Sequence, residues 1–244
     1  MTEAGTVAAW DEPPGGTPRG TLVVLPGRGE TAASYERFGR RLSADAYRVR
    51  LVPVSLDGLA DTDDLAELAD LADTVGKLLA DESLPAPKVL VGSDSGATLA
   101  ALLAAELPVD AVVLAGLALP GSAAVGSWDE EIAARTACPV HTRVISSDET
   151  FERGALNQPL PWSSVDLVPS GKPTLVLHGT ADPVTPVADA IAPYAGSARV
   201  RLVEGGVHDV LNDATHRSVA ATLVLFLESL RLGPELPAVV VDAS

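Results

Sequence analysis

The sequence predicts an α/β protein with a mostly parallel central sheet flanked by helices. Short β-branched runs alternate with longer stretches rich in alanine and leucine, which is typical of strands joined by crossover helices. Each expected strand is a short apolar run, as in strands that are covered on both faces. Hydrophobic residues make up 47% of the 244 residues, enough for a sizeable core. Because domains span roughly 100–200 residues, we expect a single domain over residues 1–244.

The same alternation places the individual elements along the chain. We expect strands, the first of them at a sheet edge, at Val7–Trp10, Thr21–Leu25, Tyr47–Val54, Lys88–Val91, Ala111–Leu114, Pro173–Leu177 and Ala198–Val203. We expect helices at Ala32–Ser43, Asp61–Ala80, Ala97–Glu106, Pro186–Tyr194 and His216–Leu232. In the second helix, leucine and valine recur every three or four residues from Leu65 to Leu79, which predicts a helix face turned toward the sheet.

One stretch, about residues 117–170, interrupts this alternation. It holds the acidic helical segment WDEEIAAR and then a run rich in proline, serine and polar residues. Since it follows one core strand and precedes the next, we expect a small lid inserted over one edge of the sheet. The tail after Gly233 is expected to be a surface extension.

Charge and cysteine content exclude several classes of protein. The formal net charge is −16, so the chain would repel phosphate backbones and anionic membranes. We therefore expect a small-molecule substrate, with neither nucleic acid nor membrane as a partner. Cys138 is the single cysteine, which excludes an internal disulfide. The N-terminus is acidic where a secretory signal would be basic, so we expect a cytoplasmic protein.

The segment Lys88–Ala104, KVLVGSDSGATLAALLA, carries the clearest chemical pattern: a strand, a tight turn and a helix. A side chain at the centre of such a turn is held at the carboxyl end of the strand, and its neighbours two residues away must be small. Centred on Asp94, both of these neighbours are glycine, Gly92 and Gly96. Centred on Ser95, they are serine and alanine, which is sterically less favourable. The simpler interpretation is a polar turn that caps a helix.

This segment resembles the nucleophile elbow of the α/β-hydrolase fold, usually Gly-x-Ser-x-Gly, with Asp94 where most members have serine. With an aspartate at that position, the segment resembles the elbow of the epoxide hydrolases and haloalkane dehalogenases. The segment Leu22–Leu42 is similar to the His-Gly-x-Gly-Glu segment of monoacylglycerol lipases and lysophospholipases, with Pro26 in place of the histidine. By that similarity, the backbone N–H groups of Arg28 and Ser95 would form an oxyanion hole, and Gly27 would lie beside the substrate.

Two later segments extend the resemblance. PTLVLHGTADPVTPV, Pro173–Val187, contains the turn that carries the triad acid in this fold, which implies Asp182. VEGGVHDVLND, Val203–Asp213, matches the Gly-x-x-His-x-x-Leu-Asn pattern of the lipases, which implies His208. The chain order Asp94, Asp182, His208 agrees with the nucleophile–acid–histidine order of the fold.

The remaining polar and aromatic candidates have weaker support. Trp128, His141 and Trp162 lie in the inserted stretch and are candidate substrate-binding residues. We expect His178 to be a packed structural residue, and Asn212 and Asp213 to cap the last helix. Histidine and cysteine residues with metal-ligand spacing are missing from the sequence, as is a glycine-rich phosphate loop, so we predict no metal and no cofactor.

An aspartate at the elbow changes the expected chemistry. Its carboxylate is ionised at neutral pH and needs no base to attack. It could open an epoxide or a strained lactone, or displace a halide, in a small and mostly apolar molecule. His208, oriented by Asp182, would then activate water against the resulting ester. However, the three tyrosines lie outside the inserted stretch, whereas epoxide hydrolases usually place tyrosines in their lids.

Two alternatives stay open at this point. The chain could be an esterase, lipase or thioesterase with Ser95 as the nucleophile. It could also be a non-hydrolytic lyase or cyclase that uses Asp94 as a general base, or a ligand-binding protein.

Overall fold

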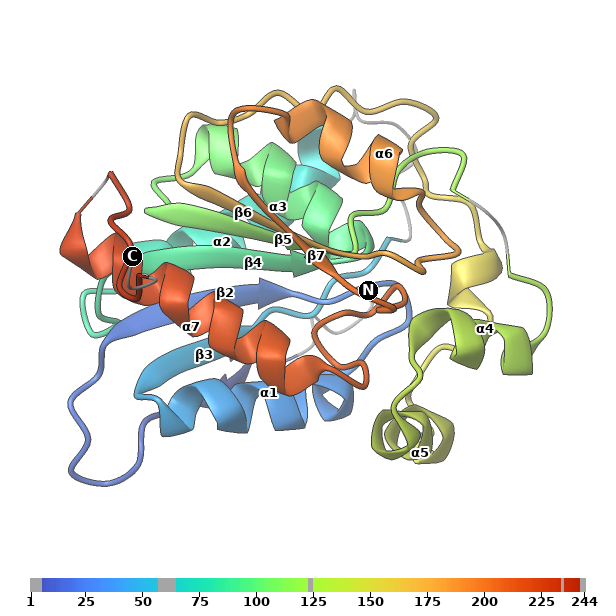
Figure 1. Cartoon of the computed structure of the whole chain (residues 1–244), viewed down its shortest axis with the longest axis horizontal. Helices are drawn as coiled ribbons and strands as arrows, with labels where there is room; N and C mark the ends of the chain where they lie inside the picture. Colours follow the sequence, from blue (N-terminus) through green and yellow to red (C-terminus); the bar gives the residue numbers. More distant parts are fainter. Residues whose placement is uncertain (1–5, 57–64, 123–124, 234, 242–244) are drawn as a thin grey trace.

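The computed structural model describes residues 6–56, 65–122, 125–233 and 235–241. Its sheet has the strand order β1-β3-β2-β4-β5-β6-β7, in which β1 is antiparallel to β3 and the other pairs are parallel (Figure 1). The strands are β1 Ala8–Trp10, β2 Gly20–Leu25, β3 Tyr47–Leu51, β4 Lys88–Ser93, β5 Ala111–Ala115, β6 Thr174–Gly179 and β7 Arg199–Val203. This mostly parallel sheet confirms the predicted fold class.

Helices cover both faces of the sheet. Helices α1 (Ala32–Ala44) and α7 (His216–Leu232) pack on one face, where their apolar side chains meet those of β2, β4, β5 and β6. Helices α2 (Leu65–Ala80), α3 (Ser95–Glu106) and α6 (Val187–Ile191), with the 3-10 helix η2 (Ala192–Tyr194), cover the other face. Figure 1 shows the two layers on opposite sides of the sheet. Alternate residues of the central strands therefore enter separate cores.

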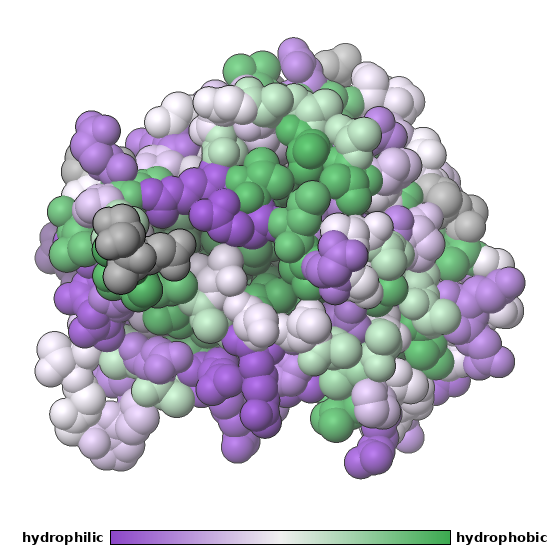
Figure 2. All heavy atoms as spheres, viewed as in Figure 1, coloured by the Kyte–Doolittle hydropathy of each residue, from purple (hydrophilic) through white to green (hydrophobic). Residues whose placement is uncertain are grey.

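Two strands depart from the expected apolar run. In β3 the burial alternates between buried and half-buried residues. In β7 none of the five residues is buried. For β7 the reason is its position in the sheet, because it pairs only with β6 and forms an edge of the sheet as described. Figure 2 shows hydrophobic side chains gathered over the area where β7 and α6 lie in Figure 1, and Leu202 of β7 is 49% exposed.

The stretch between β5 and β6 carries α4 (Trp128–Arg135), α5 (Pro139–Ser147) and the 3-10 helix η1 (Ala155–Asn157). Helix α4 coincides with the predicted acidic segment and begins with a capping box between Ser127 and Glu130. Helix α5 was missed because its sequence, PVHTRVISS, is rich in β-branched and polar residues. Of the predicted helix Asp61–Ala80, residues 61–64 lie outside the described residues. Figure 1 shows α4 and α5 at the end toward which β2 and β4 point.

Candidate active site

The turn between β4 and α3 holds Asp94 in a constrained backbone conformation. Its φ of 51° and ψ of −123° are unusual for a residue with a side chain. A Cβ atom on Gly92 would lie 2.1 Å from the carbonyl oxygen of Gly96, and one on Gly96 would lie 2.3 Å from that of Leu25. The backbone therefore passes too close for any side chain at either position, which is the steric requirement inferred from the sequence.

The carboxylate of Asp94 meets His208, which in turn meets Asp182. His208 Nε2 lies 3.0 Å from Asp94 Oδ1, and His208 Nδ1 lies 2.8 Å from Asp182 Oδ2. All three side chains are at most 3% exposed. The other oxygen of Asp182 accepts hydrogen bonds from the backbone N–H groups of Val184 (2.8 Å) and Thr185 (3.2 Å). The structure thus brings together three predicted residues that lie far apart in the sequence.

The side chain of Arg28 also binds Asp94, a contact that the sequence analysis did not foresee. Arg28 Nη2 donates to Oδ1 (2.8 Å) and Nε donates to Oδ2 (2.9 Å), while the backbone N–H of Arg28 donates to Oδ2 (2.8 Å). Nη1 donates to the carbonyl oxygen of Gln158 (3.0 Å), and the carbonyl oxygen of Arg28 accepts from Arg135 (2.7 Å). Arg28 is therefore fixed at both ends. The one sequence signal for it is a charged residue between two glycines at the end of a strand.

The charges of these groups depend on one another. Burial would raise the pKa of Asp94, but the adjacent charges of Arg28 and His208 hold it well below its usual value. Burial would lower the pKa of His208, but Asp182 and Asp94 on its two sides raise it to about 9. Burial opposes the charge of Asp182 as well, yet His208 lowers its pKa. At neutral pH these four groups are therefore two carboxylates, one imidazolium and one guanidinium, whose charges cancel.

Ser95 lies beside Asp94 without sharing its contacts. Its Oγ is buried and has no hydrogen-bond partner among the described residues. The Nε2 atom of His208, which would have to take a proton from a serine nucleophile, contacts Asp94 instead. Within the described part of the chain, therefore, no base is hydrogen-bonded to Ser95 Oγ.

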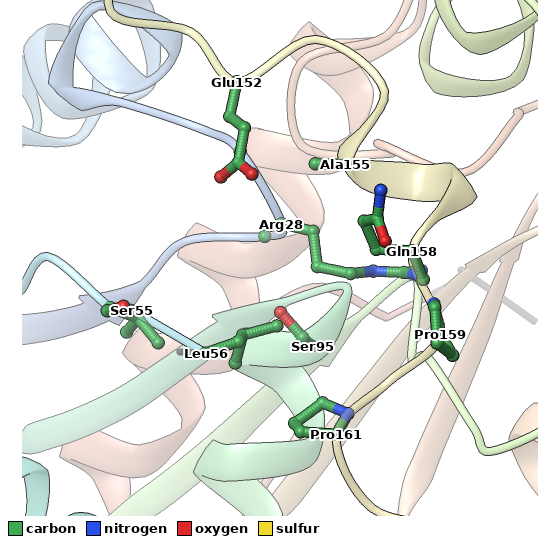
Figure 3. A pocket seen from close by; sticks show the side chains of 12 residues that line it. Arg28, Ser55, Leu56, Ser95, Glu152, Ala155, Gln158, Pro159 and Pro161 are labelled. Carbon is green, nitrogen blue, oxygen red and sulfur yellow. The ribbon is translucent and has the colours of Figure 1, made fainter. Parts of the chain in front are cut away.

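A cavity of about 360 Å³ lies over the elbow. Figure 3 shows the Arg28 side chain running toward Gln158 and Pro159, with Glu152 on one side and Ser95 on the other. The lining mixes polar and apolar residues: Gly27, Arg28, Gly29, Val54, Ser55, Leu56, Ser95, Glu152, Ala155, Gln158, Pro159 and Pro161.

Of the predicted substrate-binding residues, Gly27 lines this cavity and the other three do not. Trp128 contacts the ring of Phe151 (5.7 Å between centroids) and the guanidinium of Arg153 (5.1 Å). Trp162 is 3% exposed and belongs to the main apolar core. His141 is turned toward a second buried cluster.

That cluster comprises Glu30, His141 and Asp209, which each place one possible ligand atom within 4.8 Å of the others. His141 Nε2 lies 2.9 Å from Asp209 Oδ2, and Arg135 Nη1 lies 3.9 Å from Glu30 Oε1. Burial and the charge of Asp209 raise the pKa of Glu30 to about 7. These side chains are of types that bind divalent cations, but the guanidinium of Arg135 already lies beside Glu30 and the imidazole of His141 already contacts Asp209. Because Glu30 also accepts from the N–H of Gly27 (2.8 Å), the cluster supports the loop that carries Arg28.

The structure also tests the structural roles predicted for His178 and Asp213. His178 is fully buried and its Nε2 lies 2.9 Å from the carbonyl oxygen of Thr185, as expected of a packed structural residue. The expectation that Asp213 caps α7 is wrong. Its carboxylate instead accepts from the backbone N–H groups of Ala137 (2.6 Å) and Val207 (3.1 Å), and so joins the segment before α5 to the loop that carries the catalytic histidine candidate.

A family model described as "Alpha/beta hydrolase family" matches residues 22–222. The chain therefore belongs to the alpha/beta hydrolase family and is a hydrolase by class. None of the curated protein sequences matches it.

Several solved structures share the fold. A soluble variant of monoglyceride lipase from Saccharomyces cerevisiae is 14% identical with a TM-score of 0.70, and the match covers 91% of this chain and 90% of the lipase. An enol-lactonase from Burkholderia xenovorans LB400 is 18% identical with a TM-score of 0.66, covering 91% and 96%. A monoacylglycerol lipase from Paleococcus ferrophilus is 18% identical with a TM-score of 0.67, covering 90% and 98%. At these identities the similarity shows the fold alone.

Among the described residues, there is no helix with both the length and the apolar character that a bilayer crossing requires.

Proposed function

We propose that this hydrolase uses Asp94 as a covalent nucleophile, with His208 as its base and Asp182 as the residue that orients the base. The observation that carries the proposal is the position of His208 Nε2, which lies 3.0 Å from Asp94 Oδ1, while Ser95 Oγ has no partner among the described residues. The substrate class that fits a carboxylate nucleophile is a small molecule with an epoxide, a strained lactone or a carbon–halogen bond. The mixed lining of the cavity favours a substrate that also carries polar groups.

In the first step, a carboxylate oxygen of Asp94 attacks the electrophilic carbon. A C–O bond forms, and the bond to the leaving oxygen or halogen breaks with its electron pair. A halide departs as the anion and needs no proton. An opened epoxide oxygen needs one, and the tyrosines that usually supply it are missing from residues 117–170. The imidazolium of His208, whose pKa is raised to about 9 by Asp182 and Asp94 against the effect of burial, can donate that proton.

In the second step, water hydrolyses the ester. Esterification removes the negative charge of Asp94, so His208 loses one of the two carboxylates that stabilise its charged form and its pKa falls. After epoxide opening His208 is already neutral, and after halide departure its imidazolium releases its proton to solvent. The neutral imidazole then accepts a proton from water as the hydroxide adds to Cγ of Asp94. Collapse of the tetrahedral intermediate releases the alcohol, which takes the proton from His208. The carboxylic acid left on Asp94 then gives its proton to His208, which restores the carboxylate and the imidazolium of the resting site. The backbone N–H of Arg28, 2.8 Å from Asp94 Oδ2, supports its predicted place in the oxyanion hole, with that of Ser95 as the second donor.

We also propose that residues 117–170 act as the lid of a single-domain enzyme. This segment supplies five of the residues around the cavity: Glu152, Ala155, Gln158, Pro159 and Pro161.

The experiment is a single turnover in oxygen-18 water with 1,2-epoxybutane, 1-bromobutane and β-butyrolactone as probes, followed by mass analysis of the peptide that contains Asp94. Covalent catalysis predicts one oxygen-18 atom in the Asp94 carboxylate. Asp94→Asn should abolish turnover, and Ser95→Ala, the matched control at the next residue, should keep it. The reverse pattern would favour a serine hydrolase. Turnover without label in Asp94 would favour a noncovalent base.

A further inference from the structure

The guanidinium of Arg28 contacts both oxygens of the Asp94 carboxylate. Oδ2 receives the backbone N–H (2.8 Å) and Nε (2.9 Å) of Arg28. Oδ1 receives Nη2 at 2.8 Å and lies 3.3 Å from Nε. Whichever oxygen forms an ester, the other one keeps at least one donor from the guanidinium. The side chain of Arg28 is 5% exposed and its Nη1 is held by the carbonyl oxygen of Gln158, so it has little freedom to leave.

We propose that the Arg28 side chain is a catalytic group of the ester-hydrolysis step, as a positively charged member of the oxyanion hole. The inference rests on the proposed covalent function of Asp94. When water adds to Cγ of the ester, the carbonyl oxygen of Asp94 becomes an oxyanion. In the resting site the donors of Arg28 lie 2.8–2.9 Å from that oxygen's position, within the range that stabilises an oxyanion. A cation held there stabilises the intermediate more than neutral backbone donors alone.

The same contact affects the two steps in opposite directions. In the resting site, the guanidinium stabilises the carboxylate as an ion pair, which makes Asp94 a weaker nucleophile. In the neutral ester this stabilisation is lost, and in the tetrahedral intermediate it returns. Arg28 therefore favours cleavage of the ester over its formation. It follows that loss of the guanidinium should let the alkyl-enzyme ester accumulate.

The test measures the formation and decay of this ester separately. Wild type, Arg28→Gln, Arg28→Lys and His208→Asn are mixed with 1-bromobutane, whose leaving halide needs no proton from His208, quenched in acid over time and weighed intact. His208→Asn removes the base and should accumulate one adduct per chain, which serves as the control for covalent chemistry. Arg28→Gln should also accumulate the adduct, because decay slows about 10²–10³-fold, as on loss of an oxyanion-hole donor, while formation slows far less or becomes faster. Arg153→Gln replaces an arginine of the inserted stretch that donates to the carbonyl oxygen of Ser146 and is not among the residues that line the cavity, and it should behave as wild type.

Two further measurements distinguish a catalytic role of Arg28 from a role in folding: a second charged variant, and rescue of a truncated variant by an added guanidinium compound. Arg28→Lys keeps the positive charge but cannot bind both oxygens through a fork, so its decay should be slowed less than in Arg28→Gln. In Arg28→Ala, added ethylguanidinium should restore the decay of the preformed adduct, which a purely structural role would not predict.

The inference is overturned if His208→Asn accumulates the adduct and both Arg28 variants clear it at the wild-type rate, or if Arg28→Gln slows formation as much as decay. An absence of adduct even in His208→Asn would overturn the proposed covalent function, and this inference with it.

Discussion

The ion pair between Arg28 and Asp94 should be a large element of the stability of this fold. The two side chains are 5% and 3% exposed, and their charged groups meet at 2.8–3.3 Å. Removing one partner from a buried pair leaves an uncompensated charge, which typically costs about 3–5 kcal/mol. We therefore expect Arg28→Met to lower the free energy of unfolding by about 3 kcal/mol or more. For a chain of this size that corresponds to a fall in Tm of roughly 6–12 °C.

Urea unfolding at pH 7 of the wild type, Arg28→Met, Asp94→Asn and the double variant tests this expectation. If the pair is coupled, the double variant should lose less than the sum of the two single losses by at least about 2 kcal/mol, because it contains no unpaired charge at this position. Single losses that add to within about 0.5 kcal/mol would show that the contact contributes no net coupling energy, and would refute the reasoning.

Three further predictions concern the surroundings of this pair. Gly92→Ala would place a methyl group 2.1 Å from the carbonyl oxygen of Gly96, so we expect a loss of about 2 kcal/mol or more in unfolding experiments and of nearly all turnover; full activity would contradict the close packing. The pKa of His208 is raised from 6.5 to about 9 by Asp182 and Asp94 in spite of burial, so its contribution of about 3 kcal/mol is complete below pH 6.5 and is lost as the pH rises through 9. Urea unfolding from pH 6 to 9.5 should show this decline in the wild type and a flatter profile in His208→Asn; equal slopes would count against it. Asp213→Ala should lower stability by about 1–3 kcal/mol, because it removes the charged acceptor of two part-buried backbone N–H groups, and Asp213→Asn, which keeps one acceptor, should cost less in thermal unfolding.

The predictable part of the site was the part fixed by local sterics. The elbow needs glycine two residues before and after its central residue, and the sequence has that spacing around Asp94 but not around Ser95. The continuous apolar strands β2, β4, β5 and β6 fix where the chain emerges from the sheet, because parallel strands end at one edge. Asp182 follows the end of such a strand and His208 lies a few residues beyond β7. Glycine spacing selected Asp94, whereas Asp182 and His208 were selected by the resemblance of their segments to this fold, with which the chain order agreed.

The other features depend on contacts between distant segments, which no local pattern encodes. Arg28 and Asp94 are 66 positions apart, and the sequence alone gives no direction to a long, flexible side chain in a loop. Trp128 and Trp162 are equally suited to a pocket wall and to packing, and tertiary structure places one against Phe151 and the other in the core. The grouping of Glu30 with two residues from later segments likewise escapes a search for metal-ligand spacing.

One physical explanation accounts for both the aspartate at the elbow and the arginine in the loop between β2 and α1. A serine in place of Asp94 would leave the buried guanidinium of Arg28 without an anion, and an uncharged residue in place of Arg28 would leave a buried carboxylate with only the imidazolium of His208 as its cation. Either change alone disturbs a site whose four charges now cancel, so each residue restricts what the other can be. For the proposed function, this predicts that Asp94→Ser alone would not convert the site to a serine mechanism. A serine mechanism would require a second change at Arg28, because the guanidinium that neutralises the carboxylate would otherwise remain charged beside His208 and oppose the imidazolium that a serine nucleophile must generate.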